Sequence, residues 1–129
     1  MSCSLYAWLG ERSPKISNEL LAFDLTCGLV DEDGEAVKVE PVPTEQGARL
    51  DLCWGGWGVS IAYEEGSPVA DDAARFALPA AGLAGDRRLR LDCQRRETAQ
   101  QERKLQRLTA FLQQIYGAVV VEVSPRELA

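Results

Sequence analysis

Alternating apolar and polar residues run from Arg49 to Tyr63, and only the pair Gly55-Gly56 interrupts them. A period of two is typical of a strand with one buried face, and two consecutive glycines supply the positive φ angles of a two-residue hairpin turn. The pattern therefore predicts a β-hairpin with one wholly apolar face, which needs a covering layer of helices. In this register the facing pairs are Trp54 with Trp57, Leu52 with Val59, and Leu50 with Ile61.

Further β-prone segments flank this hairpin. Residues 3–9 alternate so that Leu5, Ala7 and Leu9 share one side and Tyr6 and Trp8 the other, and both sides are expected to be covered. Residues 26–42 predict a second hairpin around Asp33-Gly34, ended by Pro41 and Pro43 and followed by a linker over 44–48. Residues 87–94 predict a strand with Arg88 and Arg90 on a wet face. The β-branched run 118–123 predicts a strand that is central or covered on both faces.

Three amphipathic segments predict helices. The first, over about 14–24, starts at a Ser13-Pro14 cap and has an apolar stripe of Ile16, Leu20 and Phe23. The second starts at Ser67-Pro68, with a stripe of Val69, Ala73, Phe76 and Ala77. The third lies between a Thr98 cap and a Gly117 stop, with a stripe of Leu105, Leu108, Phe111, Leu112, Ile115 and Tyr116. Together these elements predict a single α+β domain over 1–129, with an antiparallel or mixed sheet and helices packed on one face.

The charge balance narrows the range of partners. The chain has 20 Asp and Glu against 14 Lys and Arg, a net charge of −6, which disfavours nonspecific binding to nucleic acid or to an anionic membrane. Residues 87–107 are locally basic, with 8 Lys and Arg against 3 Asp and Glu. We interpret this segment as solvated strand and helix faces, with a docking surface for an acidic segment or a nucleic acid as the alternative.

Cysteine usage points to a reducing compartment. The four cysteines, at positions 3, 27, 53 and 93, form no CxxC pair, and the chain contains no histidine. Neither a secretory leader nor an apolar run of membrane-spanning length is recognisable. We expect a cytoplasmic protein with reduced thiols that act as small buried apolar groups, and no zinc site.

No catalytic or cofactor motif stands out. The absence of histidine excludes a Ser-His-Asp or Cys-His arrangement, and no lysine has a nucleophile motif around it. The acidic run 31–35 is better interpreted as a turn than as a calcium loop, and Gly82 to Gly85 lacks a following helix and P-loop lysine. We therefore predict no catalytic residue, cofactor or metal site. A small carboxylate enzyme remains an alternative if a cavity groups two or more of Glu64, Asp71, Asp72 and Asp92.

The order of elements suggests a family. A strand, a hairpin with Trp54 and Trp57 running into Val59-Ser-Ile-Ala-Tyr-Glu-Glu-Gly66, a short helix, a strand, a long amphipathic helix and a Val-rich strand resemble the immunity proteins of bacterial polymorphic-toxin and type VI secretion systems. The resemblance implies a non-catalytic protein that binds and neutralises a cognate toxin with a basic surface. Type III secretion chaperones are the alternative, although those begin with a helix.

A partner surface follows from the hairpin tip and the acidic turns. Trp57 is expected in the core, whereas Trp54 lies nearer the tip, where an exposed tryptophan would anchor an interface. We predict that the partner contacts Trp54, Trp57, Glu64, Glu65, Asp31, Glu32 and Asp33. On this interpretation, Trp54→Ala combined with charge reversal of Glu64 and Glu65 weakens binding and leaves the fold intact. Homodimerisation stays open.

Overall fold

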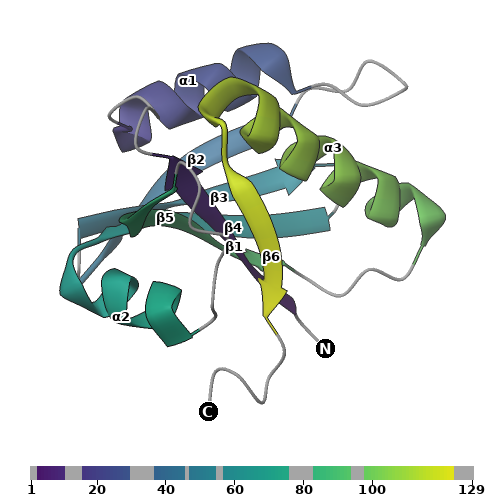
Figure 1. Cartoon of the computed structure of the whole chain (residues 1–129). Helices are drawn as coiled ribbons and strands as arrows, with labels where there is room; N and C mark the ends of the chain where they lie inside the picture. Colours follow the sequence, from purple (N-terminus) through teal and green to yellow (C-terminus); the bar gives the residue numbers. More distant parts are fainter. Residues whose placement is uncertain are drawn as a thin grey trace.

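The computed structural model describes residues 3–10, 16–29, 37–45, 47–54, 57–75, 83–93 and 98–123. Within these ranges, six strands form one antiparallel sheet in the order β2-β3-β4-β5-β1-β6 (Figure 1). Three helices complete the predicted α+β domain. The elements are β1 (Cys3–Gly10), α1 (Asn18–Gly28), β2 (Lys38–Thr44), β3 (Gly47–Trp54), β4 (Trp57–Glu65), α2 (Ser67–Arg75), β5 (Leu83–Cys93), α3 (Ala99–Tyr116) and β6 (Val119–Val123).

The two strands of the central hairpin pair as their alternation predicts. β3 and β4 are antiparallel, with the predicted facing pairs Trp54 with Trp57, Leu52 with Val59, and Leu50 with Ile61. All six side chains are buried. The turn residues Gly55 and Gly56 lie outside the described residues.

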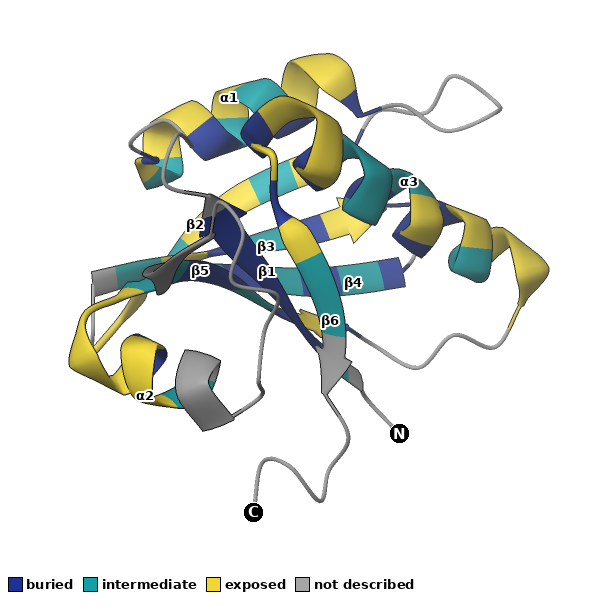
Figure 2. Cartoon of the chain, viewed as in Figure 1, coloured by how far each residue is buried: buried dark blue, intermediate teal, exposed yellow. Residues whose placement is uncertain are grey.

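The helices are distributed over both faces of the sheet (Figures 1 and 2). α1 and α3 cover the face that carries the apolar hairpin side chains, as expected. α2 instead lies on the opposite face, where its Asp72 bonds Arg88 of β5, a neighbour of the core residue Leu89. This differs from the expected placement of all helices on one face. The second face also holds the buried rings of Tyr6 and Trp8, so it too requires cover.

α3 follows its predicted limits. The Thr98 hydroxyl accepts a hydrogen bond from the Gln101 backbone N–H, and Gly117 ends the helix in the left-handed conformation at φ 67°. Lys104, buried in the described structure, donates from Nζ to the Trp54 carbonyl oxygen at 3.1 Å. This contact fixes α3 over the hairpin. No helix among the described residues is long and apolar enough to cross a bilayer.

α1 begins later than predicted. Its N-cap is Ser17, whose hydroxyl accepts from the Leu20 N–H, whereas the predicted cap residues Ser13 and Pro14 lie outside the described residues. The shift changes the buried stripe, because Leu21 and Leu25 face the core. Of the predicted stripe, only Ile16 is buried, and Leu20 and Phe23 are exposed.

The helical extension of α1 also removes a predicted strand. Residues 26–28 are helical, so they do not form the first arm of the expected hairpin around Asp33-Gly34, which itself lies outside the described residues. β2 pairs with β3 instead, and Thr44, Gly47 and Ala48 of the expected linker are paired strand residues. Pro41 and Pro43 lie inside β2 and do not end it. Proline has no backbone N–H to donate. The two prolines occupy alternate positions, so both missing N–H groups lie on the same edge of β2, and an edge strand tolerates this when that edge faces solvent.

The last two strands also differ from expectation. β5 begins at Leu83, four residues earlier than predicted, and lies between β4 and β1. Among the described strands, β6 is an edge strand that pairs with β1 alone, and its Val119 is 36% exposed. The prediction of a central or fully covered strand is therefore wrong. A high content of β-branched residues predicts a strand, but it does not predict whether that strand has one or two neighbours in the sheet.

The register of α1 can be tested by two truncations. Leu25 is 0% exposed and Phe23 is 65% exposed. Leu25→Ala leaves a core cavity, so we expect it to lower the free energy of unfolding by about 2–5 kcal/mol. Phe23→Ala, the matched control, should change it by about 0.5 kcal/mol or less. Urea unfolding monitored by circular dichroism measures both, and a larger loss in Phe23→Ala would contradict the register.

Candidate functional site

A buried arginine lies where the sequence predicts a wet strand face. Arg88 is 5% exposed. Its burial follows from topology, since β5 lies between β4 and β1 and places Arg88 opposite both Glu64 and Trp8. β1 lies far from β5 along the chain and α2 separates β4 from β5, so alternation within residues 87–94 carries no signal of its neighbours.

The Arg88 guanidinium is paired on two sides and covered by an aromatic ring. Its Nε donates to Glu64 Oε1 and its Nη1 donates to Asp72 Oδ2, each at 2.8 Å. The Arg88 Cζ lies 3.9 Å from the Tyr6 ring centroid, within cation–π range. Burial opposes the charged form, but the hydrogen bonds to Asp72 and Glu64 outweigh it, so the pKa of Arg88 lies above its ordinary value.

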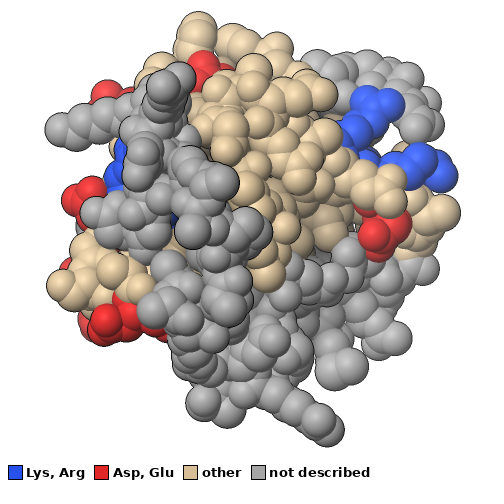
Figure 3. All heavy atoms as spheres, viewed as in Figure 1, with Lys and Arg blue, Asp and Glu red and all other residues tan. Residues whose placement is uncertain are grey.

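The carboxylates around Arg88 reach the surface although the guanidinium does not. The side chains of Glu64 and Asp72 are 25% and 29% exposed, against 6% for Arg88. Glu65 and Asp71 next to them are exposed. Among the side chains that the structure describes here, four carboxylates stand against the two guanidiniums of Arg87 and Arg88, an excess of two negative charges. Figure 3 shows acidic side chains on the α2 side of the molecule, at the lower left.

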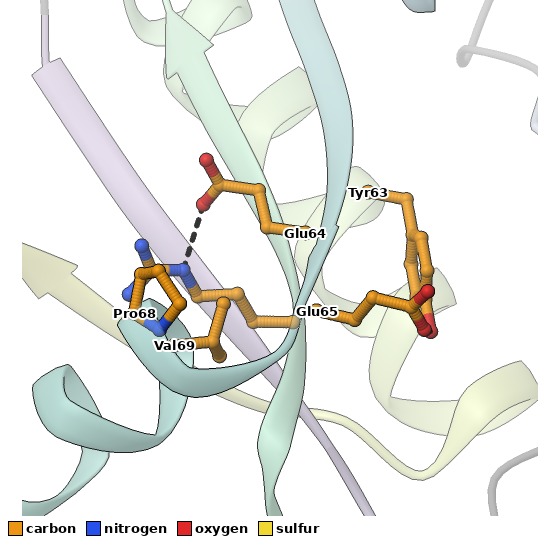
Figure 4. Close-up of a pocket in the computed structure, with 6 residues that line it drawn as sticks. Tyr63, Glu64, Glu65, Pro68 and Val69 are labelled. Carbon is orange, nitrogen blue, oxygen red and sulfur yellow. Dashed lines mark hydrogen bonds and ion pairs between the residues drawn. The ribbon is translucent and has the colours of Figure 1, made fainter. Parts of the chain in front are cut away.

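A pocket opens at this corner, where β4 ends and α2 begins. Its volume is about 410 Å³. Adjacent residues of β4 line it from opposite sides of the strand, since Glu64 points toward Arg88 while Glu65 lies beside Tyr63 (Figure 4). The residues that line the pocket are Tyr63, Glu64, Glu65, Pro68, Val69 and Arg88.

Glu65, on the other side of the strand from Glu64, is also held by a hydrogen bond. The Tyr63 hydroxyl donates to Glu65 Oε2 at 3.0 Å. Burial and the Glu65 carboxylate raise the pKa of Tyr63, and nearby Arg87 opposes this effect. Both acidic residues at the end of β4 are thus positioned by a donor from the protein itself.

The residues predicted to bind a partner fall into three groups. Glu64 and Glu65 line the pocket. Trp54 and Trp57 are 2% and 1% exposed, so the expectation of an exposed Trp54 is wrong, because α3 covers the hairpin there. Trp54→Ala would therefore damage the core and cannot serve as a surface variant. Asp31, Glu32 and Asp33 lie outside the described residues.

The thiols depart in part from their predicted role. Cys93 is buried as expected, whereas Cys27 and Cys53 are exposed. Among the described residues, no group of three or more Cys, Asp or Glu side chains could hold a metal ion.

Of the four carboxylates named for an enzyme, Glu64 lines the pocket, whereas Asp72 does not line it but shares Arg88 with Glu64. Glu64 and Asp72 meet through Arg88, while Asp92 of β5 instead accepts a hydrogen bond from Ser4 at 2.7 Å. Arg88 engages an oxygen of each converging carboxylate. That arrangement suits them to hold charge and position rather than to transfer protons.

Comparisons of the chain with protein-family models, with curated proteins and with solved structures find no match. The function has therefore to be inferred from the geometry of this chain.

The contribution of Arg88 can be measured by removing its charge. Arg88→Met leaves Glu64 and Asp72 without their common partner, so we expect it to lower the free energy of unfolding by about 2–4 kcal/mol, less than for fully buried carboxylates. The control is Arg49→Met, since the Arg49–Asp51 pair has side chains 45% and 39% exposed and should contribute at most about 1 kcal/mol. Equal losses in the two variants, measured by denaturant unfolding, would refute a structural role for Arg88.

Proposed function

We propose that this protein is a non-catalytic binding domain whose acidic pocket at the end of β4 receives a cationic side chain of a protein partner. The observation that carries the proposal is the cavity of about 410 Å³, whose lining includes Glu64, Glu65 and the buried Arg88. A lysine or arginine entering there would meet carboxylates on both sides of the strand end.

The pocket is preorganised for such a ligand. Arg88 holds Glu64, and Tyr63 holds Glu65, through hydrogen bonds of 2.8 and 3.0 Å. Carboxylates that are already ordered lose less conformational freedom on binding, which favours affinity. The apolar side chains of Pro68 and Val69 complete the lining and suit the methylene stem of a long basic side chain.

We further propose that the partner is a toxin that the protein neutralises in the cytoplasm. The resemblance to immunity proteins suggests this role, and the net charge of −6 supports it, because long-range attraction accelerates the capture of a basic toxin domain. A chaperone for a secreted effector would use the same acidic pocket on a partner that is not toxic.

A carboxylate enzyme is the second candidate, favoured by the convergence of Glu64 and Asp72 on Arg88, which lines the pocket. It ranks lower because both carboxylates are engaged by Arg88. If it were correct, Asp72→Asn would abolish an activity on a small substrate, with no partner protein required.

The test is affinity capture from the native organism, with wild-type protein and the Glu65→Lys variant in parallel. Glu65 is exposed, so reversal of its charge should leave the fold intact while it repels a basic side chain. We expect Glu65→Lys to bind the captured partner at least about tenfold more weakly, equivalent to about 1.4 kcal/mol. Wild-type protein should rescue cells from that partner, and the variant should not.

Glu45→Lys is the matched control, since Glu45 is also exposed, at the end of β2, and the substitution changes the net charge equally. It should bind as wild type does. If both variants weakened partner binding equally, the loss would come from the change in net charge, and the proposed binding pocket would be contradicted. If the captured partner were a secreted protein that is not toxic when expressed alone, the toxin-neutralising function would be contradicted and the chaperone function favoured.

A further inference from the structure

We propose that the free edge of β6 pairs with β6 of a second copy of this chain, so that two six-stranded sheets join into one. β6 bonds β1 on one side, and no described strand lies on its other side. A strand edge of this kind offers a row of backbone donors and acceptors to another strand.

The two edges of the sheet differ in how they are protected. The other edge strand, β2, contains Pro41 and Pro43 and begins with Lys38, and both proline and lysine discourage pairing with a further strand. β6 reads Val-Val-Val-Glu-Val and contains neither. It has the composition of a central strand at an edge position, which a second copy would turn into a central position.

Exposed apolar side chains lie on β6 itself and on α1 and α3, which meet where α3 leads into β6. The large exposed hydrophobic residues among those described are Leu20 and Phe23 of α1, Ile115 of α3 and Val119 of β6. α1 and α3 meet directly, since the Tyr116 hydroxyl donates to Asp24 Oδ2 at 2.8 Å. Figure 3 shows a broad surface without charged side chains over α1, the end of α3 and β6, with charges toward its margins.

Charge favours a second copy as the occupant. Two molecules of net charge −6 repel each other, so they associate best through a face with few carboxylates, whereas a basic partner gains nothing there. Antiparallel pairing about Val121 is symmetric, as a twofold dimer requires. It sets residue 122, the one acidic position of β6, opposite Val120 of the second copy, so like charges do not face each other.

The dimer leaves the pocket at the end of β4 available. β5 and β1 separate β4 from β6 in the sheet, so a partner bound at Glu64 and Glu65 need not compete with the second copy. The proposal of a dimer can therefore be tested independently of the proposed binding function.

Sedimentation equilibrium of the purified full chain, over a wide range of concentrations, tests the pairing. We expect wild-type protein to form dimers that dissociate on dilution. Val119→Lys and Ile115→Lys should each weaken the dimer by at least about tenfold, because they place a charge on the uncharged face. Both positions are exposed in the monomer, so unfolding curves of the two variants should match wild type at concentrations where wild type is monomeric.

Thr44→Lys, at an exposed position of the other edge strand, is the control and should leave the dimer unchanged. Hydrogen exchange supplies a second measurement, since the amides of residues 119–121 should exchange more slowly at dimer-forming concentrations than on dilution. A wild-type protein that stays monomeric throughout would overturn the proposal. So would a dimer that Val119→Lys and Ile115→Lys leave as stable as Thr44→Lys does.

Discussion

The double ion pair of Arg88 is the interaction on which this corner of the molecule depends. It joins Arg88 of β5 to Glu64 of β4 and to Asp72 of α2, while Tyr6 of β1 covers the guanidinium. A buried cation is tolerated only when its hydrogen bonds and its charge are matched by partners. The positions of β1, β4, β5 and α2 therefore depend on one another. This requirement explains why α2 lies on the face opposite α1 and α3.

The same constraint produces the acidic surface. One guanidinium needs two carboxylates to occupy its two donating edges, and both carboxylates extend from burial to the surface. The cluster therefore neutralises its own cation and still presents excess negative charge at a cavity. Function and stability share residues here, because Glu64 stabilises Arg88 and lines the proposed binding site. Variants of Glu65, which is exposed and accepts a hydrogen bond from Tyr63, separate the two roles better than variants of Glu64.

Local pattern was sufficient for those parts of the fold that local interactions decide. The alternation around Gly55-Gly56 predicted the facing pairs of β3 and β4, and the caps of α3 were recognisable from Thr98 and Gly117. The α1 register was missed because Ser13 and Ser17 can each cap a helix, and apolar residues at several spacings allow more than one helix start. The positions of β5 and β6 depend on pairing with β1, far away in the chain, and alternation within one strand does not encode its neighbours.

The candidate site shows the same division. Glu64 and Glu65 were recognisable as a surface acidic pair, although they belong to β4 and not to the predicted turn. Arg88, which orders Glu64, looked like one of several solvated arginines in residues 87–107. The two tryptophans were predicted to lie in the interface because they are close to the hairpin tip in the sequence. Lys104 of α3 covers that place, and a contact between residues 50 positions apart leaves no mark in the local sequence.

The most direct test of the account is a double-mutant cycle between Arg88 and Asp72, in which Arg88→Met, Asp72→Asn and the double variant are compared with wild type by denaturant unfolding. The cycle isolates the coupling between the two side chains from the cost of each substitution. If the ion pair unites β5 and α2 as described, the coupling free energy should be about 1–3 kcal/mol in favour of the pair. Additive losses, with a coupling of zero, would show that α2 docks without Arg88 and that the pocket is not organised by it.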